Sequence, residues 1–285
     1  MPQPASEPEW TQVIEPQGHL LELKLGELWR YRDLIYLFVH RDFVAQYKQT
    51  ILGPAWHFIQ PLLTTVMFTI VFGKIAQIST DGVPPFLFYM AGTIIWTYFA
   101  GVLTQTSGTF TANAGIFGKV YFPRLAVPVA HLFSKLIGFA IQFVFFLGFL
   151  AYFAWRGADI APNAWVLATP LLLLMMAMLG LGTGIIISSM TTRYRDLTVL
   201  VGFGVQLWMY ASPIIYPLST LPEQWRFWAS LNPVAPIVEL FRHAYLGAGS
   251  VDVGMIGLSL LIITGILLIG ILLFNRVERT FMDTV

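Results

Sequence analysis

Long apolar stretches separated by short polar segments dominate the chain from Leu52 to Phe274. A helix needs about 20 apolar residues to cross the roughly 30 Å hydrocarbon core of a bilayer, because each residue adds about 1.5 Å. Six stretches meet that length: Leu52 to Phe72, Pro85 to Leu103, Leu132 to Phe153, Ala164 to Met190, Leu197 to Tyr216 and Val253 to Phe274. The pattern predicts an all-α membrane protein with six transmembrane helices in a domain spanning residues 51–274.

The positions of Lys and Arg predict the orientation of these helices. Cytoplasmic loops carry an excess of basic residues. With both termini inside, 12 basic residues fall on the cytoplasmic side, namely Lys24, Arg30, Arg32, Arg41, Lys48, Lys119, Arg124, Lys135, Arg193, Arg195, Arg276 and Arg279. The other 4 fall outside, namely Lys74, Arg156, Arg226 and Arg242. We therefore expect both termini in the cytoplasm.

The segment from Glu27 to Thr50 mixes apolar residues with too many charges to cross a bilayer. Read as one helix at about 100° per residue, it has a broad apolar face. That face carries Leu28, Tyr31, Ile35, Val39 and Phe43. Arg30, Arg41 and Lys48 lie close together on the other face. We expect an amphipathic helix over residues 27–50 in the inner membrane interface. Its three cations either contact anionic lipid head groups or attract a lipid-linked phosphate or pyrophosphate.

Four further segments are not spans. Residues 1–26 are polar, acidic and contain proline, unlike a cleavable signal peptide, and residues 275–285 form the other predicted cytoplasmic tail. The segment Thr109 to Pro128 is a predicted inside loop. The segment Pro217 to Ser250 is apolar but charged, which predicts short re-entrant helices in the outer leaflet before the last span.

The composition supports a membrane domain and narrows the chemistry. The chain is 56% hydrophobic and 11% charged, with a mean hydropathy of +0.71, whereas soluble domains carry about 25% charged residues. The net charge of +1 shows no nucleic-acid footprint. Because the chain has no Cys, disulfides, thiolate metal sites and a Cys nucleophile are excluded.

Candidate catalytic groups are scarce. None of the 15 carboxylates lies in the middle of a predicted span, although an ion-driven transporter usually keeps one at membrane depth. The chain has no G-x-x-x-x-G-K-[ST] phosphate loop, and its five His show no metal-binding spacing. We therefore predict no catalytic residue, no metal site and no ATP bound by this chain through that loop.

Aromatic residues make up 15% of the chain. They either fill lipid-facing positions and interface belts, or some of them line a path on which sugar rings stack. The best path candidates lie in or at the ends of the first, second and fifth spans: Trp56, Tyr98, Trp208, Tyr210 and Tyr216. Similarly, Arg193, Arg195 and Asp196 form either a simple positive-inside turn or a docking surface for a cytoplasmic partner.

Several strings resemble the permease subunit of type-2 ABC exporters for cell-surface polysaccharides, above all the O-antigen lipopolysaccharide export permeases. They are RDFVAQYKQTILGPAWHFIQPLLTTVMFTIVFG, KVYFPRLAVP, TTRYRDL and QLWMYASPIIYPLSTLPEQWRFWASLNPVAPIVELFR. The likeness runs from about Leu34 to Arg279 in the same order and spacing. Capsule and teichoic acid permeases are relatives of the same group.

The resemblance implies a homodimer in the inner membrane, paired with two copies of a separate ATPase that binds ATP and Mg. That assembly would export a polymer linked to undecaprenyl pyrophosphate. By resemblance, residues 27–50 are a gate helix, and the loop with Phe117, Lys119, Tyr121 and Arg124 is a coupling element seated on the ATPase. The alternatives are a capsule or teichoic acid permease, a type-2 exporter of drugs or other small lipophiles, and a membrane glycosyltransferase.

Overall fold

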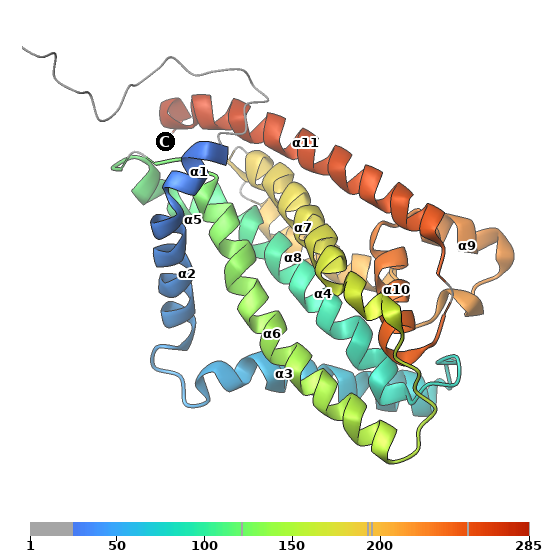
Figure 1. Cartoon of the computed structure of the whole chain (residues 1–285). Coiled ribbons are helices and arrows are strands. Elements are labelled where there is room, and N and C mark those ends of the chain that lie inside the picture. Colours follow the sequence, from blue (N-terminus) through green and yellow to red (C-terminus); the bar gives the residue numbers. More distant parts are fainter. Residues whose placement is uncertain (1–24, 121, 193, 195, 250, 285) are drawn as a thin grey trace, which may run out of the picture.

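The computed structural model describes residues 25–120, 122–192, 194, 196–249 and 251–284 (Figure 1). Helices joined by turns and short loops make up the described part, which contains no β-strand. The all-α prediction is therefore confirmed there.

Five of the six predicted stretches form helices that are long and apolar enough to cross a membrane. The first is Gly53–Ile75, built from η1 (Gly53–Ala55), α3 (Trp56–Phe68) and η2 (Thr69–Ile75). The others are α4 (Pro85–Ser107), α6 (Ala126–Trp155), Ala164–Thr191 with η3 (Ala164–Ala168) and α7 (Thr169–Thr191), and Val253–Glu278 within α11 (Val253–Thr284). The chain is thus a multi-pass membrane protein.

The predicted fifth span is shorter than expected. The helix α8 (Leu197–Tyr210) has 14 residues, or about 21 Å, which is less than the apolar thickness of a bilayer. Turns follow from Ala211, and Pro213 disfavours helical backbone at Ser212. The count of six transmembrane helices therefore stays a prediction.

The helix α4 is the centre of the molecule. It packs against α3, α6, α7, α8 and α10 (Val234–Leu246), and Figure 1 shows it between α6 and α7. In its most apolar stretch 78% of the residues are buried, against 6% for Gly53–Ile75. The first span is therefore the least buried of the five and presents large apolar side chains such as Leu63, Met67 and Ile75 to lipid or to another protein chain.

Glycines set the spacing of α7 from its neighbours. A Cβ at Gly184 would lie 2.6 Å from the Cβ of Thr106 on α4. One at Gly182 would lie 2.9 Å from the Cα of Leu267 on α11. Small residues of this kind let membrane helices approach backbone to backbone.

The N-terminal segment forms two helices, α1 (Leu25–Arg30) and α2 (Arg32–Tyr47), where the sequence predicts one helix over residues 27–50. The backbone leaves helical geometry at Tyr31, with φ −92° and ψ 19°, and again at Lys48. Its predicted apolar residues Leu28, Tyr31, Ile35 and Val39 are partly buried beside Phe38. That face packs on the rest of the protein. The position of α1 and α2 relative to a membrane stays a prediction.

The predicted inside loop contains a helix, and the outside segment contains short helices, as the sequence predicts. The helix α5 (Thr109–Phe117) begins the inside loop. The outside segment holds η4 (Leu218–Thr220), α9 (Glu223–Ser230) and α10, which ends at Gly247 in the left-handed conformation that favours glycine. Nearly all side chains of α10 are buried, so protein covers this helix. Its depth in the bilayer stays a prediction.

Candidate functional site

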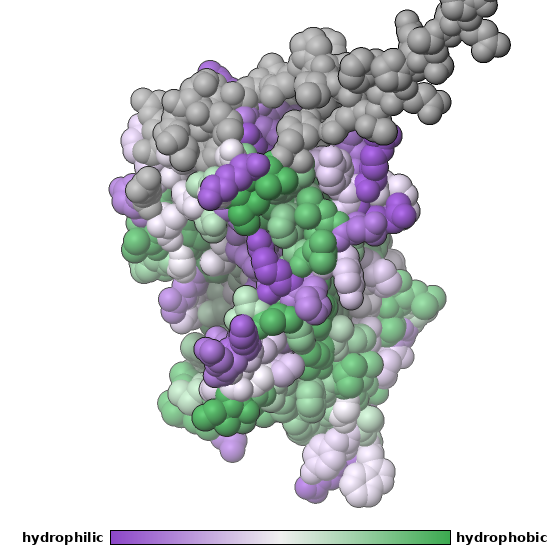
Figure 2. All heavy atoms as spheres, turned by 90° about the vertical axis from the view of Figure 1, so that its left-hand side faces the viewer, coloured by the Kyte–Doolittle hydropathy of each residue, from purple (hydrophilic) through white to green (hydrophobic). Residues whose placement is uncertain are grey.

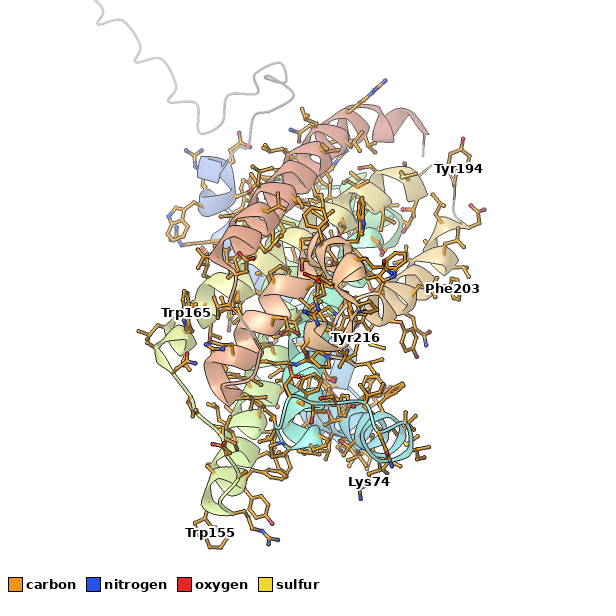
Figure 3. The ribbon with its side chains drawn as sticks, turned by 90° about the vertical axis from the view of Figure 1, so that its right-hand side faces the viewer. Lys74, Trp155, Trp165, Tyr194, Phe203 and Tyr216 are labelled. Atoms are coloured by element: carbon orange, nitrogen blue, oxygen red, sulfur yellow. The ribbon has the colours of Figure 1, made fainter. Side chains whose placement is uncertain are left out.

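The two predicted sides of the protein lie at opposite ends of the structure. In Figure 3, Tyr194 lies at one end, while Lys74 and Trp155 lie at the other. The helices α1 and α5 and the C-terminal end of α11 gather at the end that carries Tyr194 (Figures 1 and 3). This separation agrees with the distribution of basic residues.

Three of the five predicted path aromatics reach the protein surface. Trp56 at the start of α3 and Tyr210 at the end of α8 are 46% and 45% exposed. Tyr216, which follows α8, is partly buried (Figure 3). Because α3 packs against α4 and α6 while α8 packs against α4 and α7, Trp56 and Tyr210 sit on different sides of α4. A single chain does not bring them together.

The other two path aromatics have internal partners. Tyr98 is 3% exposed and its ring packs 5.7 Å from that of Phe139, so it lies in the core of the single chain. The indole of Trp208 donates a 3.1 Å hydrogen bond to Asn232 Oδ1 and packs edge-on against Phe99. Trp208 therefore ties α8 to the turn before α10, a role that the sequence does not reveal.

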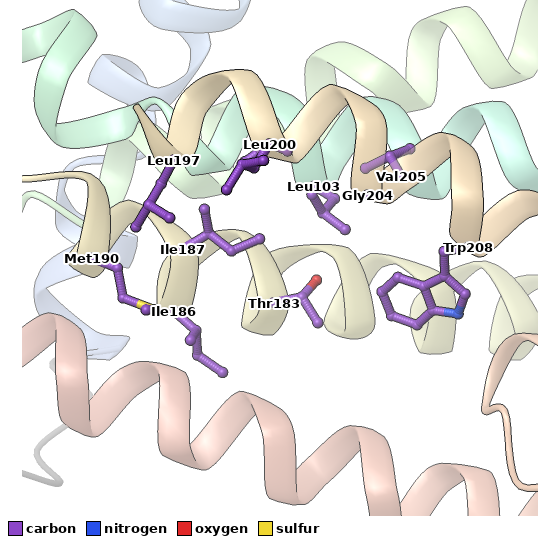
Figure 4. Close-up of a pocket in the computed structure, with 11 residues that line it drawn as sticks. Leu103, Thr183, Ile186, Ile187, Met190, Leu197, Leu200, Gly204, Val205 and Trp208 are labelled. Carbon is purple, nitrogen blue, oxygen red and sulfur yellow. The ribbon is translucent and has the colours of Figure 1, made fainter. Parts of the chain in front are cut away.

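An apolar groove of about 420 Å³ lies between α7 and α8, with Leu103 of α4 at its floor (Figure 4). Met190 and Leu197 lie at one end and Trp208 at the other. Thr183 contributes the one hydroxyl among the lining residues that are described. The groove suits an apolar chain better than a sugar, because it offers few hydrogen-bonding groups.

A polar cluster that the sequence analysis missed joins α2 to the transmembrane helices. Arg41 donates two hydrogen bonds to Asp42 Oδ1, of 2.8 and 3.0 Å, and Gln105 of α4 donates one of 3.2 Å to Oδ2. The ring nitrogen Nδ1 of His131, on α6, lies 3.2 Å from the same Oδ2. We call these four residues the Asp42 cluster.

The electrostatics of the Asp42 cluster keep its carboxylate ionised. Burial raises the pKa of Asp42, but the bonds from His131 and Arg41 outweigh burial, so the pKa lies below its ordinary value. The side chain of Asp42 is 13% exposed. Figure 2 shows the face of the molecule that carries α2, where polar side chains gather among apolar ones.

Lys135, which the sequence assigns to the cytoplasmic side, is a second ionisable residue beside the transmembrane helices. It lies inside the apolar helix α6, and its stem packs 3.1 to 3.5 Å from the Cβ position of Gly101 on α4. An ionisable residue within an apolar helix is the signal that could have identified it.

A second buried charge lies in the outside segment. Arg242 of α10 is 1% exposed and donates hydrogen bonds to the carbonyl oxygens of Phe88, Pro213 and Ile214, at 3.3, 2.6 and 2.6 Å. Its Nη1 lies 3.8 Å from Glu239 Oε1. The guanidinium therefore holds α10, α4 and the turn after α8 together.

The predicted head-group residues do not share one helix face. Arg30 ends α1, Arg41 lies in α2 and Lys48 follows the end of α2. Arg30 and Lys48 are exposed. Arg41 is partly engaged by Asp42 and by the ring of Phe38, 4.8 Å from its guanidinium carbon. Their role stays a prediction.

The predicted coupling residues divide into three groups. Lys119 and Asp196 are exposed and free to meet a partner protein surface. Phe117 is buried, and Arg124 donates a 2.6 Å hydrogen bond to the carbonyl oxygen of Glu278 on α11. Tyr121, Arg193 and Arg195 lie outside the described residues. The bond from Arg124 to Glu278 ties the loop after α5 to the end of α11.

Comparison with known proteins identifies the family. The ABC-2 type transporter family profile matches residues 33–246. The O-antigen export system permease protein RfbA of Klebsiella pneumoniae is 26% identical over 266 residues, which cover 92% of this chain and 98% of that protein. An RfbA of Myxococcus xanthus is 25% identical over 77% of this chain and 82% of its own. The capsule polysaccharide export inner-membrane protein BexB of Haemophilus influenzae is 23% identical over 84% and 89%. The resemblance read from the sequence is confirmed, and the chain belongs to the ABC-2 type transporter family.

Proposed function

We propose that the chain is the transmembrane subunit of an ATP-driven exporter that moves a lipid-linked polysaccharide, O-antigen in the first instance, across the inner membrane. The observation that carries this proposal is the similarity to O-antigen export permeases over 92% of the chain. A capsule polymer is the second candidate, because the capsule export proteins are similar over most of the chain as well.

The active assembly is a homodimer with two ATPase subunits. The first span supports a second membrane partner, since one side of it packs on α4 and α6 while large apolar side chains such as Leu63, Met67 and Ile75 remain exposed. The lack of a phosphate loop supports a separate ATPase, which binds ATP and Mg. Lys119 and Asp196 meet that ATPase at the predicted cytoplasmic end, together with Tyr121, Arg193 and Arg195. Phe117 and Arg124 take part in the coupling by positioning this loop on the rest of the chain.

The polymer passes along aromatic side chains exposed by α3, α8 and the segment after α8. Stacking on flat rings suits a sugar chain that moves in many small steps, because each contact is weak. Trp56, Tyr210 and Tyr216 are the surface candidates, and Trp208 supports them from behind through Asn232. Arg30, Arg41 and Lys48 attract the phosphate end of the carrier lipid.

Deletion of the gene tests this function. We expect loss of surface polysaccharide and accumulation of lipid-linked polymer inside the cell, with both restored by the gene in trans. A deletion strain with normal surface polysaccharide would contradict the proposal. Loss of drug resistance with intact polysaccharide would favour a small-molecule exporter, and loss of polymer both inside and outside would favour a glycosyltransferase.

A further inference from the structure

One face of α6 carries a polar strip in an otherwise apolar helix. His131, Lys135, Gly138 and Gln142 are spaced i, i+4, i+7 and i+11, so they lie on the same side of the helix. This side packs toward α2, α3 and α4, because His131, Gly138 and Gln142 are buried and α6 contacts all three helices. The strip is therefore built into the protein and does not face bulk lipid.

Two glycines shape the space around the strip. A Cβ at Gly101 would lie 3.1 Å from Cδ of Lys135, and a Cβ at Gly138 would lie 2.9 Å from Nδ1 of His57 on α3. A side chain at Gly138 would force His57 to move, and one at Gly101 would press on the Lys135 stem. The strip thus holds Lys135 and His57 in defined positions between packed helices.

Around the strip on α6, cationic side chains outnumber carboxylates. Asp42 is its carboxylate, and the hydrogen bonds to that carboxylate come from Arg41, Gln105 and His131. In the described part of the chain, the Lys135 ammonium makes no hydrogen bond and no ion pair within 4.0 Å, and the Asp42 carboxylate acts on it only from farther away. A charge held among packed helices without a partner is costly, so an anion bound beside Lys135 would be favoured.

Unsatisfied polar atoms surround the same place. The Tyr47 hydroxyl, Gln105 Oε1 and Gln142 Oε1 are buried without a hydrogen-bond partner among the described residues. The ring of Tyr47 packs edge-on against His57 at 5.1 Å. Burial raises the pKa of Tyr47 to about 12, so its hydroxyl stays protonated and can donate a hydrogen bond. Of these three atoms only the Tyr47 hydroxyl can donate to an anion, and because buried polar groups are normally satisfied, this hydroxyl is the donor available to a ligand here.

We propose that Lys135, His131, His57 and the Tyr47 hydroxyl form a binding site for the phosphate group of a lipid phosphate or diphosphate, part of which the Asp42 carboxylate occupies in this structure. The identity of the lipid rests on the proposed function, in which the cargo is lipid-linked. The ligand phosphate displaces the Asp42 carboxylate from His131 and brings an anion into direct contact with the Lys135 ammonium. This site is separate from Arg30 and Lys48, which lie on the exposed surface of the N-terminal segment.

Binding of farnesyl diphosphate, farnesol and inorganic diphosphate to the purified full-length chain in detergent tests the site. We expect farnesyl diphosphate to bind and Lys135→Gln to weaken it about tenfold or more, because a charge-assisted bond to phosphate is lost. Asp42→Asn should strengthen it several-fold, because the competing carboxylate is removed. Replacing Lys135 should not change the binding of farnesol, because farnesol carries no phosphate. Equal, Lys135-dependent binding of inorganic diphosphate would support the site with free phosphate as its source.

Two further variants separate the site from a folding defect. Lys135→Arg keeps the positive charge and should retain most of the affinity. Gly101→Ala leaves Lys135 in the sequence but pushes its stem aside, so affinity should fall, whereas Gly148→Ala on α6 meets nothing within 4 Å and should bind normally. Unchanged affinity in Lys135→Gln, or weaker binding in Asp42→Asn, would overturn the inference.

The binding assay does not depend on export. If the gene fails to support surface polysaccharide but farnesyl diphosphate still binds in a Lys135-dependent way, the proposed function falls and the phosphate site stands. If export is confirmed while Lys135→Gln binds farnesyl diphosphate like the natural chain, the site is wrong and the function stands.

Discussion

At the scale of single residues, buried charges decide how the outside segment is held. Arg242 satisfies three backbone carbonyls from two other parts of the chain, and Glu239 is its buried counter-ion. Glu239 Oε1 also accepts a 3.3 Å hydrogen bond from the amide of Leu218. The two side chains therefore link α4, α10 and the turns on both sides of Tyr216.

Replacing Arg242 with Met should destabilise the protein strongly. The change leaves Glu239 as a buried carboxylate without its cation and frees three carbonyl groups, and breaking a buried pair costs about 3 to 5 kcal/mol. We expect a marked drop in thermal unfolding temperature in detergent. The double variant with Glu239→Gln should recover part of it. Arg156→Met, at an exposed arginine, is the control, and an equal drop there would contradict this role for Arg242.

The Asp42 cluster predicts a dependence of stability on pH. Because the pKa of Asp42 lies below its ordinary value of 3.8, the stabilisation is fully present above that value and is lost as the pH falls through the lowered pKa. Charge-assisted hydrogen bonds contribute about 1.5 to 3 kcal/mol, less where water screens them. The unfolding temperature of Asp42→Asn should be several degrees lower near neutral pH and should converge on the natural value in acid.

A matched control for this experiment lies on the same helix. Asp33 has a side chain that is 91% exposed, and its contact with Arg32 is 3.9 Å long. Asp33→Asn should therefore leave the unfolding temperature unchanged at every pH. A constant difference between Asp42→Asn and the natural chain from neutral to strongly acidic pH would contradict the assigned ionisation.

At the scale of helices, close backbone contact replaces the hydrophobic effect as the reason why α7 and α11 stay together. A Cβ at Gly270 would lie 2.8 Å from the carbonyl oxygen of Gly182, so neither helix has room for a side chain at the crossing. Lipid tails are as apolar as Leu, and packing density therefore holds such helices in place.

Gly270→Ala should force α7 and α11 apart and cost about 1 to 3 kcal/mol, the usual range for overpacking. Gly265→Ala, on the same helix, adds a Cβ that meets nothing within 4 Å and should be neutral or slightly stabilising, because Ala favours helix over Gly. Thermal unfolding of both variants in detergent makes the comparison. Similar values for the two would show that the crossing tolerates a wider separation.

At the scale of the whole molecule, the single chain leaves many apolar side chains of the first span and of α8 exposed. Trp56 and Tyr210 are half exposed on different sides of α4, and Phe203 of α8 projects outward in Figure 3. A path for a polymer would need more than one chain to enclose it. Export by the assembled transporter is therefore the measurement that tests the aromatic path.

Replacing Trp56, Tyr210 and Tyr216 together with Leu should reduce export per molecule while leaving the amount of protein in the membrane near normal. Aromatic contacts are worth about 0.5 to 1.5 kcal/mol each beyond the area they bury, so three losses should slow export at least tenfold. Surface polysaccharide divided by the membrane-bound amount of the protein is the measurement. Trp155→Leu, at an 83% exposed indole remote from α8, is the control. Unchanged export per molecule in the triple variant would remove the conduit assignment.

Adding Trp208→Leu to the triple variant should lower the amount of protein as well, because its hydrogen bond to Asn232 ties α8 to the turn before α10. Trp208→Leu alone should therefore show the loss in protein amount. A single variant with normal amount and reduced export would instead place Trp208 on the path.

The isolated chain should hydrolyse no ATP, and its ATPase should co-purify with it. Asp196→Lys and Lys119→Glu reverse exposed charges at the predicted cytoplasmic end, and each should weaken co-purification or uncouple hydrolysis from export. Asp159→Lys reverses an exposed charge on the opposite predicted side and should assemble normally. Normal assembly and export by both test variants would leave these residues as markers of topology only.

The sequence by itself determined the membrane class, five of the spans and the family. Apolar runs of about 20 residues and the order of the strings around Asp42, Arg124 and Tyr210 are local properties, so they can be read without coordinates. The break at Tyr31 could not be predicted in this way, since neither Gly nor Pro marks it.

Only the tertiary structure decided which polar residues meet. Asp42, Gln105 and His131 are up to 89 positions apart, and Arg242 reaches carbonyl groups 154 and 28 residues away. No periodicity encodes such pairs, because they depend on how α2, α4, α6 and α10 cross. The same reason explains why Tyr98 and Trp208, chosen for their places in the second and fifth predicted spans, have the internal partners Phe139 and Asn232.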